Sequence, residues 1–261
     1  MWWGQGIGPL RSNVSRFLVR HMANQADAIT VRDEKSAELL KVVGAKGSIE
    51  TVADPAFALT PKPWQEIHSQ TGQGVRATDY ALGGDHLIFA VRTWKNNDFL
   101  ERVGCDESLG QQMKAAADSS AVADFRMHPS EEAALPGSVS SSPIWRWDQG
   151  DASIEQVINV FATAKMVVAM RLHALIFAAR CGVPFVALSY DPKVDALASA
   201  CGQEDALLNV NDTSLTRDRL LETITRVRDT DTQRRVTLNE FAMVQGERAR
   251  RPAAVAANLL S

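Results

Sequence analysis

Three basic side chains follow buried strands in this sequence. Arg171 and His173 come directly after the apolar run of residues 166–170, and Lys193 comes four residues after the apolar run of residues 185–189. Guanidinium groups bind carboxylates and phosphates through two parallel hydrogen bonds, and a lysine adds a point charge. A histidine transfers protons near neutral pH. These residue types therefore predict a site for an anionic ligand, with general acid–base chemistry.

The segment between the two apolar runs determines where these side chains lie. Residues 174–181 predict an apolar helix that ends at Gly182, so the whole segment predicts a strand–helix–strand unit. Such a crossover makes the two strands parallel, and their carboxyl ends then open at the same edge of the sheet. We therefore expect Arg171, His173 and Lys193 to converge on one crevice, the usual ligand site of open α/β sheets.

Two further strands bring polar side chains to the same predicted edge. Arg92 follows the strand of residues 86–91, and His128 follows the strand of residues 121–127. Arg92 has a simpler alternative role in an ion pair with a surface carboxylate, and His128, which precedes Pro129, has the alternative of an ordinary loop residue. The predicted substrate-binding residues in this part of the chain are Arg92, His128, Arg171, Leu172, Tyr190 and Lys193.

A glycine-rich loop lies near the start of the chain. The stretch Gly4-Gln5-Gly6-Ile7-Gly8 is followed by Pro9, which occupies the place of the third glycine in a dinucleotide-binding GxGxxG fingerprint. The spacing therefore argues against a dinucleotide cofactor. The loop instead predicts a tight turn whose backbone approaches a neighbouring segment or a ligand, and Gly6 and Gly8 are our candidates for substrate contacts.

A helix is predicted to follow this loop, capped by Ser12 or Asn13. Its apolar residues recur at helical spacing, and we expect the side that they form to pack into the core. This side is formed by Val14, Phe17, Leu18 and Met22, together with His21.

The remaining elements predict two α/β domains. Strands at residues 28–31 and 49–52, with a helix between them, make the first part a β-α-β-α-β series, which is half of a doubly wound domain. We divide the chain into a partial Rossmann-like domain, a linker, a second Rossmann-like domain and terminal helices. The boundaries are residues 1–60, 61–84, 85–235 and 236–261.

The helices of the second half have their own sequence signals. Ser153 and Gln156 form a capping box for a helix at residues 154–162. Asp191 either orients Lys193 or caps the helix that follows it. Further on, the sequence predicts a short strand at residues 207–208, a helix capped by residues 212–214 that runs to about residue 228, and two helices at residues 233–248 and 252–260.

Composition narrows the function classes. The chain has 261 residues, 45% of them hydrophobic, and a net charge of −3, which argues against a general nucleic-acid-binding protein. Its three cysteines show no CxxC spacing, so we expect reduced thiols in the cytoplasm and no zinc site. We find no membrane-spanning run, no signal peptide and no metal-ligand spacing. We therefore expect at most peripheral contact with the inner face of the membrane, and no metal or cofactor.

Three strings together resemble one family. RLHALIFAARCGVPFVALSYDPKV at residues 171–194, GQGIGPLRS at residues 4–12 and ITVRDEKSAELL…VADPAF at residues 29–57 are similar, in this order, to the motifs of the polysaccharide pyruvyl transferases. The resemblance spans most of the chain. One departure is Ala169, which stands where the family pattern has glycine and adds a methyl group near the turn.

The resemblance implies a GT-B-like fold and a chemistry. Phosphoenolpyruvate would donate its pyruvyl group to a sugar of a cell-wall or extracellular polysaccharide, forming a pyruvate ketal and releasing phosphate. His173 would be the general acid/base, and Arg92, Arg171 and Lys193 would hold the carboxylate and the phosphate. The expected partners are phosphoenolpyruvate and a glycan or lipid-linked saccharide acceptor, with a homo-oligomer as a further expectation.

Two alternatives remain open at this point. A GT-B glycosyltransferase that uses a nucleotide sugar would place a carboxylate near the site to hold the ribose. The carboxylate considered for this role, Glu204, lies too far along the sequence from the turn of residues 190–193. An inactive remnant that binds a phosphorylated ligand is the other alternative. The family has a glycine-rich GNxGD-like motif before the first string, and this sequence lacks it. We therefore expect a first domain that begins partway, a chain that binds phosphoenolpyruvate but transfers poorly, and self-association through an open strand edge.

Overall fold

The computed structural model describes residues 1–61, 85–92, 98–127, 144–146 and 153–260, with only the backbone described at residues 144–146. The chain divides into two compact units. Unit 1 consists of Met1–Leu59 and Ala242–Ser261, and unit 2 of Thr60–Phe241. Most of the predicted linker lies outside the described residues, and so does His128, one of the predicted substrate-binding residues.

Unit 1 contains a small parallel sheet with two helices. Its elements are β1 (Trp2–Gln5), α1 (Asn13–Ala23), β2 (Ile29–Val31), α2 (Glu34–Val43), β3 (Ile49–Thr51) and the short 3₁₀ helix η1 (Pro55–Ala58). The strands pair in the order β1-β2-β3, all parallel. This arrangement confirms the predicted β-α-β-α-β series. Its core residues are Ala23, Ile29, Val31, Ala37 and Leu40.

Helix α1 begins where the sequence predicts, and both helices of unit 1 have side-chain caps. The Ser12 hydroxyl accepts a hydrogen bond from the backbone N–H of Ser15, and the Ser15 hydroxyl bonds back, which makes a capping box for α1. Asp33 caps α2 by accepting from the N–H of Ser36 at 2.8 Å. Gly44 ends α2 with a φ of 88°, a left-handed conformation that glycine adopts without a steric penalty.

The prediction that the apolar side of α1 packs into the core is wrong. Val14, Phe17, Leu18 and Met22 are all exposed, and His21 beside them is exposed as well. The helix instead contacts the rest of unit 1 through its opposite side, where Ala23 is buried and Val19 is partly buried.

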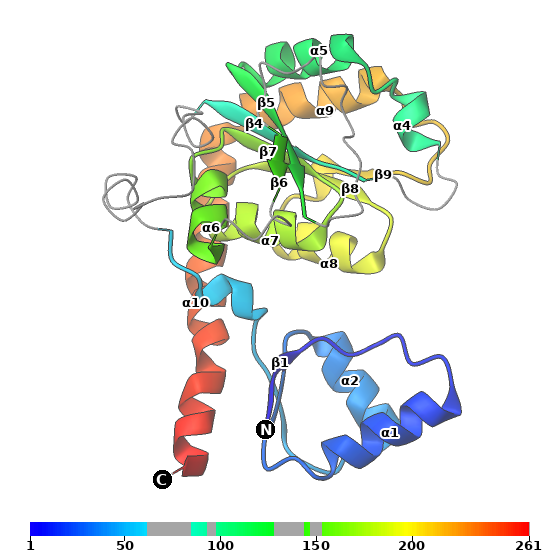
Figure 1. The fold of residues 1–261 in the computed structure, drawn as a ribbon, viewed down its shortest axis with the longest axis vertical. Coiled ribbons are helices and arrows are strands. Elements are labelled where there is room, and N and C mark those ends of the chain that lie inside the picture. The colour runs from blue at the N-terminus through cyan, green and yellow to red at the C-terminus, as the bar shows by residue number, and fades with distance from the viewer. Residues whose placement is uncertain (62–84, 93–97, 128–143, 147–152, 261) are drawn as a thin grey trace. The chain divides into compact units, whose positions relative to one another are not determined.

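Unit 2 is a doubly wound domain with a six-stranded parallel sheet (Figure 1). The strands are β4 (His86–Ala90), β5 (Ala121–Arg126), β6 (Ile144–Arg146), β7 (Met166–Ala169), β8 (Phe185–Ser189) and β9 (Leu207–Asn209). The helices are α4 (Phe99–Arg102), α5 (Glu107–Ala117), α6 (Ile154–Ala162), α7 (Leu172–Arg180), α8 (Pro192–Ala200) and α9 (Arg217–Asp229), with the 3₁₀ helix η5 (Glu204–Ala206). In Figure 1, α5 and α9 cover one face of the sheet, and α6, α7 and α8 cover the other.

The strand order contains one reversal. The sheet runs β6-β5-β4-β7-β8-β9, so the chain moves outward from β4 through β5 to β6 and then returns to the other side of β4 with β7. Open α/β sheets bind ligands at such a switch point, outside the carboxyl ends of the strands. Every residue of β7 and β8 is buried, as expected for strands covered on both faces.

Three helix boundaries differ from the sequence prediction. Helix α8 already begins at Pro192, because the Asp191 carboxylate caps it by accepting from the N–H of Lys193 at 2.9 Å. Helix α9 is capped by Thr216, since Asp212 instead accepts the N–H of Ser214 in the preceding turn. The two predicted terminal helices are one helix.

That single terminal helix is α10 (Asp231–Leu260), and it continues through Pro252. A proline removes one helical hydrogen bond, but the alanine-rich residues that follow Pro252 have a high helix propensity and favour continuation of the helix. Within unit 1, the last part of α10 is joined to β3 by Arg251, whose Nε donates to Glu50 Oε1 at 2.8 Å. Within the ranges that the structure describes, no helix meets the length and apolarity that a bilayer span requires.

Candidate functional site

The candidate site lies at the switch point between β4 and β7 in unit 2. In the register of these two strands, Ala90 pairs with Ala169. Two residues beyond this pair, the chain reaches Arg92 on one strand end and Arg171 on the other. Parallel pairing therefore brings two arginines to the same place at the carboxyl edge, as the sequence predicts.

Arg92 is oriented by an aromatic side chain at the end of β8, two strands away from β4 in the sheet. Its Nη2 donates a hydrogen bond to the Tyr190 hydroxyl at 3.0 Å, and its guanidinium carbon lies 5.2 Å from the centre of the tyrosine ring. Tyr190 follows β8 and packs against the unit 2 core with its ring. The half-buried phenol thus supports the guanidinium both by a hydrogen bond and by a cation–π contact.

Arg171 lies where β7 joins α7, in surroundings that disfavour its positive charge. It occupies the N-cap position of α7, although its side chain makes no capping hydrogen bond. Burial lowers the pKa of Arg171 below its ordinary value, the neighbouring Arg92 guanidinium lowers it further, and Tyr190 acts in the opposite direction. The positive N-terminal end of α7 adds to the same field. An anion at this place would relieve the repulsion between the two arginines.

Leu172 and His173 form the first turn of α7. Leu172 is partly buried, and His173 is exposed. The centre of the imidazole ring lies 6.4 Å from that of Phe177, one helical turn further along. The histidine is therefore held against α7 while remaining accessible from solvent, which suits a group that exchanges protons with a bound ligand.

Lys193 lies in the first turn of α8. Its side chain is partly buried, and its helix follows β8, the strand next to β7. Of the two roles that the sequence left open for Asp191, the structure shows helix capping. Lys193 is thus placed at the same sheet edge as Arg171 by the neighbouring strand and helix.

Sequence reasoning missed two charged residues on β5. Asp124 and Arg126 are buried, with Arg126 only 7% exposed at the carboxyl end of the strand next to β4. Charged side chains at alternate positions of an otherwise apolar strand are costly to bury without a partner, and this pattern was the available signal. Arg126 adds a third arginine to the carboxyl edge of β5, β4 and β7.

The two glycines predicted to contact substrate lie in unit 1, where each has a packing role. A Cβ at Gly6 would lie 2.5 Å from the Arg32 Nε, and that guanidinium donates to Asp54 Oδ2 at 2.7 Å. Gly8 has a φ of +104°, and a Cβ there would approach Leu39 to 2.9 Å. Packing within unit 1 therefore explains both glycines, and their role in substrate binding stays a prediction.

The residue that departs from the family pattern is part of the core. Ala169 is fully buried in β7 and pairs with Ala90 and Ala187 on the two neighbouring strands. Its methyl group therefore fills space between the sheet and its covering helices.

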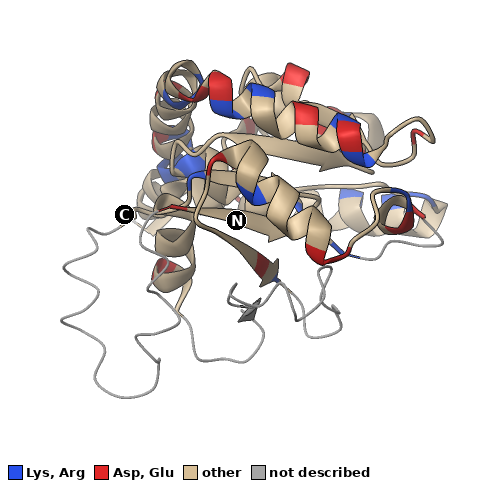
Figure 2. Ribbon diagram, turned by 90° about the horizontal axis from the view of Figure 1, so that it is seen from above, with Lys and Arg blue, Asp and Glu red and all other residues tan. Residues whose placement is uncertain are grey.

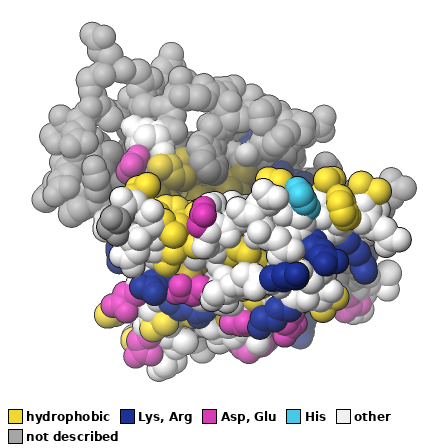
Figure 3. All heavy atoms as spheres, turned by 90° about the horizontal axis from the view of Figure 1, so that it is seen from below, with side chains coloured by type: hydrophobic (Ala, Val, Ile, Leu, Met, Phe, Trp, Pro, Cys, Tyr) yellow, Lys and Arg dark blue, Asp and Glu magenta, His cyan; other side chains and the backbone are white. Residues whose placement is uncertain are grey.

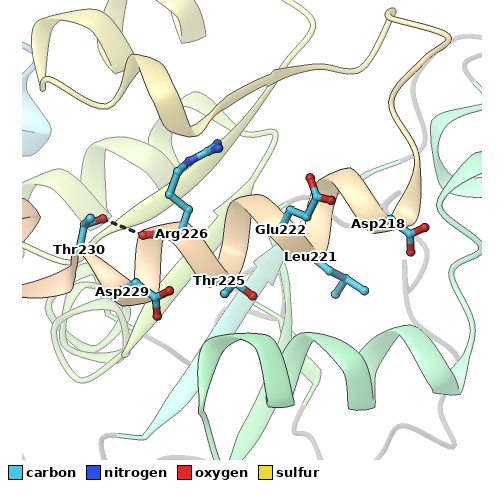
Figure 4. A pocket seen from close by; sticks show the side chains of 7 residues that line it. All are labelled: Asp218, Leu221, Glu222, Thr225, Arg226, Asp229 and Thr230. Atoms are coloured by element: carbon cyan, nitrogen blue, oxygen red, sulfur yellow. Dashed lines mark hydrogen bonds between the residues drawn. The ribbon is translucent and has the colours of Figure 1, made fainter.

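A surface groove elsewhere in unit 2 does not carry comparable chemistry. It runs along α9 and is lined by Asp218, Leu221, Glu222, Thr225, Arg226, Asp229 and Thr230 (Figure 4). All of these residues come from one helix and its end, so no second element supplies an opposing wall. On the helix ribbons in Figure 2, the positions of basic and acidic residues are interspersed, in contrast to the two neighbouring arginines, Arg92 and Arg171, at the switch point. In the described parts of the chain, no group of three or more His, Cys, Asp or Glu side chains is placed to hold a metal ion.

Solved structures share the fold at low sequence identity. Os79 from O. sativa, in complex with UDP, matches with a TM-score of 0.57 and 13% identity over 91% of this chain and 57% of its own. A candidate UDP-N-acetylglucosamine 2-epimerase from Listeria monocytogenes matches with a TM-score of 0.56 and 14% identity over 97% of this chain and 64% of its own. The trehalose-6-phosphate synthase OtsA matches with a TM-score of 0.50 and 11% identity over 95% of this chain and 63% of its own.

These likenesses establish a GT-B-like fold built from Rossmann-like α/β units. The chain spans less than two thirds of the length of each of these proteins. It matches no curated protein sequence. The family model described as polysaccharide pyruvyl transferase, however, matches residues 1–192, which include both arginines, the histidine and the glycine-rich loop. Because this match covers well over half of the sequence, the chain belongs to the polysaccharide pyruvyl transferase family, a family of transferases.

Proposed function

We propose that this chain transfers the pyruvyl group of phosphoenolpyruvate to a sugar of a cell-wall or extracellular polysaccharide, forming a pyruvate ketal. Membership of the family supports the reaction class. The observation that carries the choice of donor is the pair Arg92 and Arg171, brought together at the switch point of unit 2 and mutually repulsive without an anion.

Phosphoenolpyruvate has the charge distribution that this edge would compensate. It carries a carboxylate on its central carbon and a phosphate on the oxygen bonded to that carbon. Guanidinium groups bind both of these anionic groups in a bidentate manner. In the proposal, Arg171 and Arg92 hold these two groups, and Lys193 offsets the charge on the phosphate as it leaves. Tyr190 serves by keeping Arg92 in place through its hydroxyl group.

His173 supplies the proton chemistry in this proposal. Protonation of the terminal CH₂ carbon turns the central carbon into an oxocarbenium-like electrophile. One sugar hydroxyl attacks that carbon and loses its proton, the C–O bond to phosphate breaks, and a second hydroxyl attacks and loses its proton to close the ketal. The exposed imidazole is suited to donating the first proton and to accepting one afterwards.

A nucleotide-sugar donor is the main competing function. Os79 is described in complex with UDP, and the epimerase is named for a UDP-sugar, but at 13–14% identity this likeness concerns the fold alone. Glu204, the carboxylate considered for a ribose, lies in η5 immediately before β9. It is therefore at the amino end of a parallel strand, on the edge opposite to Arg92 and Arg171.

The experiment that tests the function follows the pyruvyl group. The full chain is incubated in D₂O with phosphoenolpyruvate labelled with ¹³C at its terminal carbon, together with a panel of hexose- and hexosamine-containing saccharides, free and lipid-linked. We expect saccharide-dependent phosphate release, and a labelled ketal methyl group that carries one deuterium.

Each other outcome has a defined meaning. Sugar transfer from UDP-glucose in a parallel incubation, without ketal formation, would replace the proposal by a glycosyltransferase. Binding of phosphoenolpyruvate without turnover on any acceptor would reduce the chain to a phospholigand-binding protein.

A further inference from the structure

Charged side chains also gather at the carboxyl edge of the unit 1 sheet. Its strands end at Gln5, Val31 and Thr51, and Arg32 and Asp54 follow the second and the third of them. The Nη1 of Arg32 donates a hydrogen bond to Asp54 Oδ2 at 2.7 Å. Open parallel sheets with helices bind ligands at this edge. The ion pair therefore lies where a ligand of unit 1 is expected.

The glycine-rich loop lies against this ion pair. Gly6 follows β1, and its missing side chain leaves room for the Arg32 guanidinium, since a Cβ there would lie 2.5 Å from the Arg32 Nε. The next residue, Ile7, donates its N–H to Ser36 Oγ at 2.9 Å, which fixes the loop to α2. Asp54 is held by its other oxygen, Oδ1, which caps η1. Segments from all three strand ends thus keep the pair in place.

Burial distinguishes this pair from an ion pair on the open surface of the same unit. The Arg32 and Asp54 side chains are 20% and 10% exposed, whereas those of Arg251 and Glu50 are 54% and 41% exposed. On the face of the molecule seen in Figure 3, basic and acidic side chains lie side by side at the surface, where water screens them. The Arg32–Asp54 pair is sheltered but still reachable from solvent, and hydrogen bonds to it are stronger than at the open surface.

The charges around Arg32 select against an anion. Its Nε lies 3.6 Å from Asp33 Oδ2, so one guanidinium faces two carboxylates, and a phosphate would be repelled. A guanidinium has five N–H donors and a carboxylate has about four acceptor positions, so the two groups can bind each other and a polar ligand at once. Neighbouring hydroxyl groups of a sugar are the matching ligand, because each hydroxyl both donates and accepts.

We propose that Arg32 and Asp54 bind hydroxyl groups of the saccharide acceptor. One hydroxyl donates to the Asp54 carboxylate, and a neighbouring hydroxyl accepts from the Arg32 guanidinium. The acceptor of the proposed reaction is a sugar, and hydroxyl groups that do not enter the ketal can make this contact. The inference rests on the proposed function for the role of the saccharide as acceptor, but saccharide binding can be measured without turnover.

A purely structural role of the ion pair is the alternative. The pair would then only tie the loop after β1 to the segment after β3, and its loss would lower the free energy of unfolding without a specific effect on saccharide binding. A variant that removes both charges separates the two roles, because it leaves no buried charge unpaired. Arg32→Met/Asp54→Asn is such a variant, and asparagine is also a good capping residue for η1.

The test uses the full chain and saturation-transfer difference NMR, without phosphoenolpyruvate. The probes are the methyl glycosides of glucose, galactose and mannose, N-acetylglucosamine, and a methyl glucoside whose hydroxyl groups are all methylated. We expect binding of sugars with free hydroxyl groups and none of the methylated sugar. Arg32→Met/Asp54→Asn should bind these sugars about tenfold or more weakly, because hydrogen bonds to charged groups are lost. Its binding of phosphoenolpyruvate, which we assign to unit 2, should be unchanged.

A matched control breaks the exposed ion pair of unit 1. The Arg251→Gln variant loses the contact with Glu50 and should bind sugars like the wild type. The proposal is overturned if no sugar binds the wild type, if the double variant binds sugars like the wild type, or if that variant loses binding of sugars and of phosphoenolpyruvate alike.

Failure of this inference is distinguishable from failure of the proposed function. Ketal formation with an unchanged KM for the acceptor in the double variant would refute the saccharide site and leave the transfer reaction. Saccharide binding that depends on Arg32 and Asp54, without ketal formation on any acceptor, would support the site and refute the transfer reaction.

Discussion

At the scale of single residues, the site rests on like charges held close together. The Arg92 guanidinium contributes to the lowered pKa of Arg171, second only to burial. The Tyr190 hydroxyl keeps Arg92 in place, so the pair is oriented before a ligand arrives. Such preorganised positive charge lowers the stability of the free protein, and a bound anion offsets the repulsion between the two arginines.

The first prediction concerns His173. The His173→Ala variant should lose transfer by about 10²–10⁴-fold, the usual cost of removing a proton-transfer group, and should still bind phosphoenolpyruvate. Its thermal unfolding should match that of the wild type because the side chain is exposed. Phosphate release in the presence of an acceptor measures the effect, and His21→Ala, at another exposed histidine, is the control. Near-native turnover of the His173 variant would show that the proton-transfer role is wrong.

The second prediction separates charge from geometry at Arg171. Lysine keeps the positive charge but loses the two-pronged hydrogen bonding, so Arg171→Lys should reduce transfer nearly as much as His173→Ala does, by about 10²-fold. Arg180→Lys, at the last residue of the same helix, should leave transfer unchanged. The account of bidentate binding does not survive if both substitutions have the same small effect on phosphate release.

At the scale of elements, local signals in the sequence predict most of the fold. The bounds of α6 and β8 are the predicted ones, because the capping box of Ser153 and Gln156 marks the start of α6 and the apolar run of residues 185–189 marks β8. Local signals do not say what covers an apolar side, and this is why the exposed side of α1 was not foreseen. They also do not choose between neighbouring caps, as Thr216 and Asp212 illustrate.

The site follows the same division between local and distant information. Arg92, Arg171 and the helix that bears Lys193 are found by one rule, that polar residues after parallel strands share an edge. The contact of Arg92 with Tyr190 joins residues 98 positions apart and depends on strand order, which the sequence alone does not give. Arg126 was missed because it lies within its strand and not beyond it.

A third prediction belongs to the turn between α7 and β8. Gly182 has a φ of +65°, and a Cβ there would lie 2.1 Å from the Asn239 Oδ1 on α10. Gly202 has nearly the same φ, +66°, but its Cβ would meet only Thr237 Cγ2 at 3.5 Å. Gly202→Ala should therefore cost only the left-handed backbone penalty, about 1–2 kcal/mol of unfolding free energy, and Gly182→Ala should cost more.

Denaturant unfolding of these variants isolates the clash. Adding Asn239→Ala to Gly182→Ala should recover the excess cost and leave the backbone penalty, whereas adding it to Gly202→Ala should recover nothing. Equal losses in the two glycine variants, with no recovery, would mean that the exposed Asn239 side chain rotates away from the added Cβ without cost.

At the scale of the whole molecule, charge and fold point to the same place. The chain has 28 basic and 31 acidic side chains, yet arginines gather at the one reversal in the strand order of unit 2. The structural relatives share that parallel α/β architecture, and the family match supplies the reaction class. All residues assigned to the donor belong to unit 2, so donor binding can be measured without an acceptor.

Calorimetric titration of the full chain with phosphoenolpyruvate, and separately with UDP-glucose, tests the central claim most directly. The account predicts micromolar to millimolar binding of phosphoenolpyruvate, much weaker binding of UDP-glucose, and loss of phosphoenolpyruvate binding in the Arg92→Gln/Arg171→Gln variant. Tighter binding of UDP-glucose than of phosphoenolpyruvate, or unchanged phosphoenolpyruvate binding in that variant, would contradict it.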